Sequence, residues 1–179
     1  MQSVKAELGS HFAIQWRYFS LEQVNSKEGL DWKLWEQPDD YPSRGLNAFR
    51  AAAAARAQGE ASFDAFHYAL LRARHEEKRD IADLATLIDV AESIGLEIDG
   101  FRNDFNDRRL LEKLEADHTF AVETMGIFGT PTLVFPEQQA VFLKMSLPPS
   151  PEESVALFED IRRLAEERRN IKEIKRPGL

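Results

Sequence analysis

The sequence predicts an α/β fold in which a large helical insertion interrupts a smaller scaffold of strands and helices. Three observations support this fold class: a period-2 segment near the start, helical patterns through the middle, and short β-rich runs after residue 126. The 179 residues are enough for one domain with an inserted part. We expect residues 1–28 and 126–179 to form the scaffold and residues 29–125 to form the helical insertion.

The composition is that of a globular chain with an acidic surface. Hydrophobic residues make up 43% and charged residues 30%, and no apolar run approaches the roughly 20 residues that span a bilayer. The net charge of −8 repels phosphate backbones, which argues against nucleic acid as a partner. From the missing apolar run we expect no membrane association, and because residues 1–10 lack the pattern of an export signal we expect a cytoplasmic location.

The first predicted element is a strand over residues 12–19. Large apolar side chains occupy alternate positions in it, with more polar residues between them; the apolar ones are Phe12, Ile14, Trp16 and Tyr18. A period of two residues is typical of a strand with one buried face, and the more polar second face fits an edge strand.

Four helices are expected in the middle of the chain. The first covers residues 46–58, contains an alanine run and ends before Gly59. Ser62 is expected to cap the second helix and Asp80 the third. The inward side chains of the third helix would be Ile81, Leu84, Ala85 and Ile88. The fourth helix would run over residues 107–125 with a buried stripe of Leu110, Leu111, Leu114, Ala121 and Val122.

A hairpin and a closing helix are expected at the end. Residues 132–135 and 140–145 are short β-rich runs whose connection, residues 136–139, is short enough for an antiparallel turn. Ser150 and Glu153 form a capping box with Pro151 at the first helical position. The buried stripe of this helix would be Leu157, Phe158, Ile161 and Leu164.

The segment GIFGTPTLVF, residues 126–135, predicts a tight turn before the hairpin. Gly126 and Gly129 allow backbone angles or close approaches that a side chain would block. Thr130 precedes a proline and is therefore disfavoured in a helix. Pro131 lies just before a strand, where its missing N–H is tolerated if the bond is cis or if proline is the first residue of the strand.

The order of these segments resembles the DsbA-like thioredoxin-fold family, which includes disulfide oxidoreductases, 2-hydroxychromene-2-carboxylate isomerases and kappa-class glutathione transferases. The resemblance rests on IQWRYFSLEQVN, FDAFHYALLRARHEEKRDI, AVETMGIFGTPTLVF and AVFLKM, in that order. It implies a thioredoxin-like fold and a cis-proline turn in which Gly129, Thr130 and Pro131 bind substrate. It also implies that His67, in the helical insertion, lines the cleft. The implied partners are a thiol, a disulfide peptide or a glutathione-like small molecule.

The chain departs from this family because it contains no cysteine. Family members carry a first strand and a Cys-x-x-Cys motif before the strand that resembles residues 12–19, and this chain appears without that first strand. Thiol–disulfide exchange requires a thiolate, which no other side chain replaces. We therefore expect a DsbA-like oxidoreductase family protein that lacks its redox cysteines, has no catalytic residue or cofactor, and is inactive alone.

The alternative is a non-catalytic module that binds a peptide or a small molecule. Loss of a central strand would also expose sheet edges, so we expect a homodimer, a strand swap or a poorly stable chain. No metal site is expected, since no two of the four histidines have the i, i+4 spacing. His118 is expected to be a hydrogen-bonded buried histidine, and His11 and His75 to be exposed.

Overall fold

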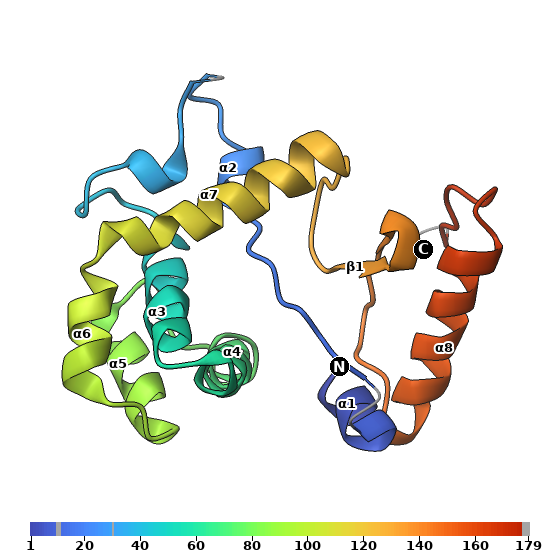
Figure 1. Ribbon diagram of the computed structural model, residues 1–179, viewed down its shortest axis with the longest axis horizontal. Helices are drawn as coiled ribbons and strands as arrows, with labels where there is room; N and C mark the ends of the chain where they lie inside the picture. Colours follow the sequence, from blue (N-terminus) through green and yellow to red (C-terminus); the bar gives the residue numbers. More distant parts are fainter. Residues whose placement is uncertain (10–11, 30, 177–179) are drawn as a thin grey trace. The chain divides into compact units, whose positions relative to one another are not determined.

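The computed structural model describes residues 1–9, 12–29 and 31–176 (Figure 1). The chain divides into two compact units, which are treated separately below. Unit 1 comprises Met1–Trp16 and Ala121–Leu179, and unit 2 comprises Arg17–Phe120. The boundaries expected from the sequence, at residues 28 and 126, stay a prediction.

Unit 1 contains a two-stranded antiparallel sheet and two helices. Its elements are α1 (Gln2–Leu8), β1 (Thr132–Phe135), a 3₁₀ turn (Pro136–Gln138), β2 (Gln139–Phe142) and α8 (Pro151–Glu167). Thr132 lies opposite Phe142, and Phe135 lies opposite Gln139. The predicted hairpin is confirmed, although β2 starts one residue earlier than expected and ends at Phe142.

The core of unit 1 forms around α8. The Phe158 ring lies 5.1 Å from that of Phe12 and 5.9 Å from that of Phe135, measured between ring centroids. The capping box is confirmed: Glu153 N donates to Ser150 Oγ, and Ser150 N donates to Glu153 Oε2. The cap defines where α8 begins, and its buried residues, among them Phe158, pack toward the hairpin.

All regular elements of unit 2 in the described part of the chain are helices. Its elements are α2 (Leu21–Val24), η2 (Leu34–Glu36), α3 (Leu46–Ala57), α4 (Glu60–His75), α5 (Leu84–Ser93), α6 (Ile98–Phe105), η3 (Arg108–Leu111) and α7 (Glu112–Thr119). Helix α3 packs against α4, α5, α6 and η3. Its buried alanines, residues 51–55, allow these neighbours to approach closely.

Two of the predicted helix caps are wrong. Helix α4 begins at Glu60 after Gly59, and Ser62 instead donates its hydroxyl to the Gln58 carbonyl. Helix α5 is capped by Asp83, whose carboxylate accepts from the N–H groups of residues 85 and 86. Asp80 lies three residues upstream and closes the preceding turn through Ala82 N. Both aspartates have the chemistry of a cap, and the turn between them decides which one begins the helix.

The later start of α5 also shifts its buried face. Leu84 and Ala85, expected to point inward, are exposed, whereas Leu87 and Val90 are buried. Ile88 is buried as expected.

The predicted fourth helix is present in three pieces, η3, α7 and a π-helical turn (Phe120–Thr124). Val122, placed in the buried stripe by the sequence, is 37% exposed because the π-helical turn changes the residue spacing. Helix α6 was not expected from the sequence.

The predicted strand at residues 12–19 is not formed. The segment keeps the alternating burial of a strand, with Phe12, Ile14 and Trp16 less exposed than the residues between them. A strand also needs a neighbour to share its hydrogen bonds. The two strands of the described residues pair only with each other.

The aromatic core of unit 2 gives a stability prediction. Phe66 in α4 is fully buried, and its ring lies 5.7 Å from that of Phe101. We expect Phe66→Ala to lower the free energy of unfolding by about 3–5 kcal/mol in urea denaturation, because it leaves a cavity. Leu71→Ala, on the exposed side of the same helix, should change it by less than about 0.5 kcal/mol. Equal losses in the two variants would contradict this assignment of the core.

Candidate functional site

The turn before β1 is shaped by its two glycines. Gly126 has a φ of 64°, a region that favours glycine, and Ile127 N donates to Ala121 O at 2.9 Å. Gly129 is buried, and an added Cβ would lie 3.1 Å from the Phe142 ring. The turn therefore needs glycine at one position for its backbone angle and at the other for close packing.

Thr130 and Pro131 are exposed, and the peptide bond between them is cis. Thr132 Oγ1 donates to Gly129 O at 2.7 Å, and Leu143 N donates to Pro131 O at 3.0 Å. These two hydrogen bonds fix the backbone on either side of Thr130. Neither backbone group of Thr130 has a hydrogen-bond partner among the described residues. The turn thus leaves the N–H and C=O of an exposed residue without a partner in the described part of the chain.

Apolar surface lies next to this turn. Phe128 is 67% exposed, and its ring centroid lies 5.0 Å from that of Phe142, which is 40% exposed. Aromatic rings of this kind can pack against apolar side chains of a bound partner, whatever the exact sequence of that partner. The turn therefore combines free backbone groups with an aromatic surface.

His67 lies in α4 of unit 2, whereas Gly129, Thr130 and Pro131 lie in unit 1. The expectation that they share one site stays a prediction. The His67 ring stacks on Phe63, with centroids 5.8 Å apart and planes at 20°. Burial lowers the pKa of His67, and Arg56 lowers it further, while Asp64 acts in the opposite direction. The neutral imidazole is therefore the favoured form near neutral pH.

Close to His67, the Arg56 guanidinium and two aromatic rings form a cluster within unit 2. The Arg56 guanidinium lies 3.6 Å from the Phe63 ring centroid and 4.9 Å from that of Tyr18. Arg56 also pairs with Glu60 at 3.2 Å. Burial is the main cause that raises the pKa of Tyr18, to about 12. Tyr18 is therefore an uncharged phenol at neutral pH, where it can donate but does not act as a base.

A buried carboxylate at the end of α7 fixes the segment that precedes α2. The Asp117 side chain is 3% exposed, and it accepts from Arg17 Nη1 at 2.8 Å and from Tyr18 N at 3.2 Å. Lys113, one turn earlier in α7, lies 3.2 Å from the same carboxylate. The next residue, His118, accepts a hydrogen bond from Ser20 N at its Nδ1, at 3.1 Å.

The hydrogen bond to His118 defines its tautomer. Because Nδ1 accepts from Ser20 N, the neutral ring carries its proton on Nε2. The ring packs against those of Phe19 and Trp35, with centroids 5.0 and 5.5 Å away. Burial lowers the pKa of His118, and Lys33 adds to the effect. The expected buried, hydrogen-bonded histidine is confirmed, and His75 is exposed as expected; His11 lies outside the described residues.

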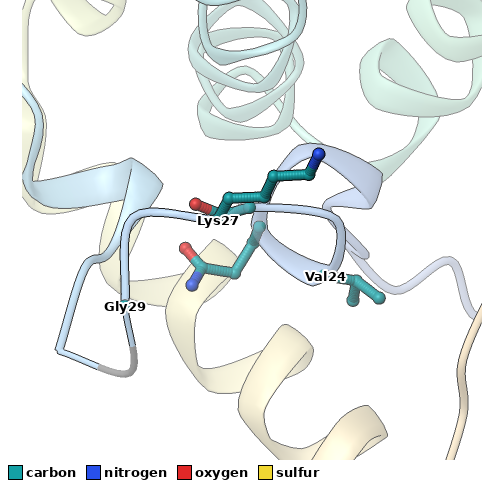
Figure 2. Close-up of a pocket in the computed structure, with 5 residues that line it drawn as sticks. Val24, Lys27 and Gly29 are labelled. Carbon is teal, nitrogen blue, oxygen red and sulfur yellow. The ribbon is translucent and has the colours of Figure 1, made fainter.

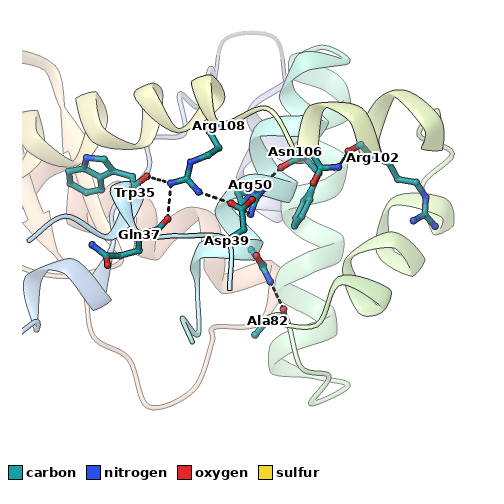
Figure 3. A network of polar contacts seen from close by, with 10 residues as sticks. Trp35, Gln37, Asp39, Arg50, Ala82, Arg102, Asn106 and Arg108 are labelled. Atoms are coloured by element: carbon teal, nitrogen blue, oxygen red, sulfur yellow. Dashed lines mark hydrogen bonds and ion pairs between the residues drawn. The ribbon is translucent and has the colours of Figure 1, made fainter. Parts of the chain in front are cut away.

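Another polar cluster fixes the connection between η2 and α3, residues 37–45 (Figure 3). Arg108 donates to Asp39 at 2.6 Å and to the carbonyls of Trp35 and Gln37 at 3.0 and 2.7 Å. Arg50, 5% exposed, donates to the same Asp39 carboxylate and to Phe105 O. Both guanidinium groups are engaged in holding backbone segments together, which is a structural role.

Unit 2 contains an open pocket of about 350 Å³, lined by Gln23, Val24, Ser26, Lys27 and Gly29. Figure 2 shows this part of the chain, with Val24, Lys27 and Gly29 labelled. The Gln23 amide is occupied, since it donates to Trp32 O and accepts from Leu34 N. Lys27 is the single charged lining residue. This arrangement lacks a set of converging polar groups that would bind a specific ligand.

The described residues contain neither a metal-ligand cluster nor a membrane-spanning helix. No group of three or more histidine, cysteine, aspartate or glutamate residues is placed to hold a metal ion within residues 1–9, 12–29 and 31–176. In the same part of the chain, no helix is both long enough and apolar enough to cross a membrane.

The sequence did not predict the buried Asp117 carboxylate and its hydrogen bonds to Arg17 and Tyr18. Its only local signal is a lysine one turn before an Asp-His pair in α7. Its other partners lie about one hundred residues earlier, and no periodicity links them. The aromatic pair of Phe128 and Phe142 was missed as well, because residues in a turn and on a strand become neighbours only through the register of the hairpin.

The comparisons with known proteins define the class of this chain. Residues 1–146 match the model of the family described as Thioredoxin, so the chain belongs to the thioredoxin family. This confirms the thioredoxin-like part of the expected fold. The DsbA-like subfamily, the oxidoreductase activity, the cytoplasmic location and the homodimer stay predictions.

A particular relative was also found. Over 116 residues the chain is 28% identical to the ClpXP adapter protein SpxH of Bacillus subtilis (strain 168). The matched region covers 64% of this chain and 38% of that protein, so the chain spans well under half of the relative's length.

The buried His118 gives a prediction for pH dependence. Its pKa is lower in the folded state than the unfolded value of about 6.5, so the folded chain binds fewer protons. Its contribution to the free energy of unfolding is therefore complete above about pH 6.5 and falls as the pH drops toward the folded pKa. In His118→Asn, the side-chain oxygen can still accept from Ser20 N but does not titrate. We expect this variant to lose less stability than the wild type between about pH 7.5 and 5.

The measurement is urea denaturation at a series of pH values. His75→Asn, at an exposed position, serves as the control and should follow the wild type. A wild-type pH profile in His118→Asn would show that another group governs stability in this range.

Proposed function

We propose that this chain is a non-catalytic peptide-binding module of the thioredoxin family, which acts as an adapter for a client protein. The observation that carries the proposal is the turn at Gly129, Thr130 and Pro131. Thr130 is an exposed residue there, and its backbone N–H and C=O have no partner among the described residues. An extended peptide has the matching acceptor and donor and can bind there through its main chain.

The surroundings of the turn support a peptide as the ligand. The exposed rings of Phe128 and Phe142 offer apolar contact to a client side chain next to the backbone hydrogen bonds. Such contacts tolerate many sequences, which suits an adapter with several clients.

The name of the relative also supports a role as an adapter. SpxH is called an adapter protein of ClpXP, and the matched region is 38% of it. An adapter needs binding surfaces rather than a nucleophile, which agrees with a chain that contains no cysteine. We therefore place peptide binding before catalysis for this chain.

Peptide binding can be tested with a fluorescein-labelled insulin B chain whose cysteines have been reduced and alkylated. We expect binding to raise its fluorescence anisotropy. Thr130→Pro removes the exposed N–H and should weaken binding about tenfold, whereas Thr130→Ser keeps the backbone donor and should bind as the wild type does. Thermal unfolding should first show that both variants are folded. Unchanged binding by folded Thr130→Pro would refute the proposed contact.

The second candidate is a DsbA-like thiol–disulfide oxidoreductase. Membership of the thioredoxin family and the order of the resembling segments favour it. In this reaction a thiolate attacks one sulfur of a disulfide, forms a mixed disulfide and releases the other sulfur as a thiolate. The printed sequence supplies no such thiol, so the attacking group would have to come from glutathione or from a thiol substrate.

The two candidates differ in an insulin-reduction assay with dithiothreitol as reductant. We expect insulin to precipitate at the same rate with and without this chain, because the chain provides no thiol to relay electrons. Thioredoxin serves as the positive control. An acceleration that grows with the concentration of the chain would favour the oxidoreductase.

A further inference from the structure

The hydrogen bond between Ser20 and His118 determines where α2 lies. Ser20 is fully buried, and His118 Nδ1 accepts from its backbone N–H at 3.1 Å. The Ser20 hydroxyl accepts from Gln23 N and its carbonyl accepts from Val24 N, so the helix begins at this residue. A helix of four residues is not stable by itself. The position of α2 therefore depends on this contact with α7.

Two other contacts fix the chain on either side of α2. Before the helix, Tyr18 N donates to the Asp117 carboxylate at 3.2 Å. After it, Arg108 donates to Trp35 O in η2 at 3.0 Å. Between these two anchors lie the described residues of 19–34, which we call the α2 segment. Neither anchor uses the imidazole, so both can persist when the charge of the imidazole changes.

The hydrogen bond from Ser20 N exists only while the His118 ring is neutral. In the protonated ring both nitrogens carry hydrogen, and neither can accept. Two N–H groups would then face each other in a buried place, and Ser20 N would lose its acceptor. If Ser20 moves away from the ring, water can replace the lost acceptor. Protonation of His118 therefore favours separation of the two residues.

The surroundings of the ring strengthen this coupling. Burial lowers the pKa of His118, and the Lys33 ammonium of the α2 segment lowers it further. Asp117 is paired with Arg17 at 2.8 Å and with Lys113 at 3.2 Å. Further charged side chains on α7 and on the segments packed against it are Glu22, Glu36 and Glu115. Release of the α2 segment would move Lys33 away and admit water, so the released state binds the proton more readily.

The Trp35 ring supplies a second observation that favours release. It is 6% exposed and packs against His118, with centroids 5.5 Å apart. Its indole N–H is buried and has no hydrogen-bond partner among the described residues. A buried donor without an acceptor destabilises the closed arrangement. An opening beside this ring would give the N–H access to water.

We propose that His118 is a pH-sensitive switch: protonation of its imidazole breaks the hydrogen bond from Ser20 N and releases the α2 segment from α7. The two anchors and the packing of α3 against its neighbours stay in place, so the change is local. The open pocket described above changes with the segment, because all of its lining residues belong to it. Acid therefore alters this surface of unit 2 while the helical core remains folded.

Amide hydrogen exchange measured by NMR between about pH 7.5 and 4.5 tests the switch, with the His118 ring signals followed in the same samples. The folded pKa of His118 lies below about 6.5, the value for an exposed imidazole, so opening becomes easier by up to about tenfold per pH unit below 6.5. We expect the protection factor of Ser20 N to fall at least about tenfold as His118 takes up its proton. The buried Val90 in α5 should stay better protected than Ser20 by more than about tenfold.

Low concentrations of urea show whether the opening is local. A local opening exposes little surface, so urea should leave the exchange of Ser20 N unchanged but accelerate that of Val90 N. In His118→Asn the side-chain oxygen accepts from Ser20 N and takes up no proton. The protection factor of Ser20 should therefore not depend on pH in this variant. His75→Asn, at an exposed position, is the control and should behave as the wild type does.

Three results would overturn the proposal: a protonated His118 with Ser20 N still protected, an equal effect of urea on Ser20 and Val90, or pH-dependent protection of Ser20 in folded His118→Asn. The first two need only the wild type, so they decide the question even if the variant does not fold. The readout is exchange without any peptide present. Failure of the switch is therefore distinct from failure of the proposed function.

Discussion

The buried carboxylate of Asp117 is the constraint on which the arrangement of unit 2 depends. An ionised group that is 3% exposed is stable only if charges and donors compensate its lost hydration. Arg17, Tyr18 N and Lys113 supply that compensation. Because two of these donors belong to the segment before α2, the carboxylate holds this segment against α7. The next residue, His118, holds the same segment against α7, because its Nδ1 accepts a hydrogen bond from Ser20 N.

The other polar contacts of unit 2 follow the same principle of joining distant backbone segments. Arg108 and Arg50 share the Asp39 carboxylate, and both also donate to main-chain carbonyls. Irregular connections have few hydrogen bonds of their own, so side-chain donors of this kind replace them. Around these contacts, the alanines of α3 let neighbouring helices pack closely. In unit 2 these buried charges therefore serve structure, since they join helices and irregular segments.

Local chemistry made several elements of the fold predictable. The capping box at Ser150, the alanine-rich helix and the hairpin each depend on residues close together in sequence, and all three are confirmed. The prediction of a strand at residues 12–19 was wrong. Alternating apolar side chains indicate which face of a segment is buried, whereas a strand also needs a neighbouring strand to share its hydrogen bonds. The choice between Asp80 and Asp83 depended on a turn that composition does not specify. In the candidate site, the sequence indicated the turn itself, but the aromatic pair beside it depends on strand register.

The position of Thr130 has a consequence for how several clients would share this chain. The residue has one backbone N–H and one C=O, and neither has a partner among the described residues. An extended segment that uses both groups leaves none for another segment. Clients that bind at this turn are therefore mutually exclusive, and the abundance of one client limits the access of the others.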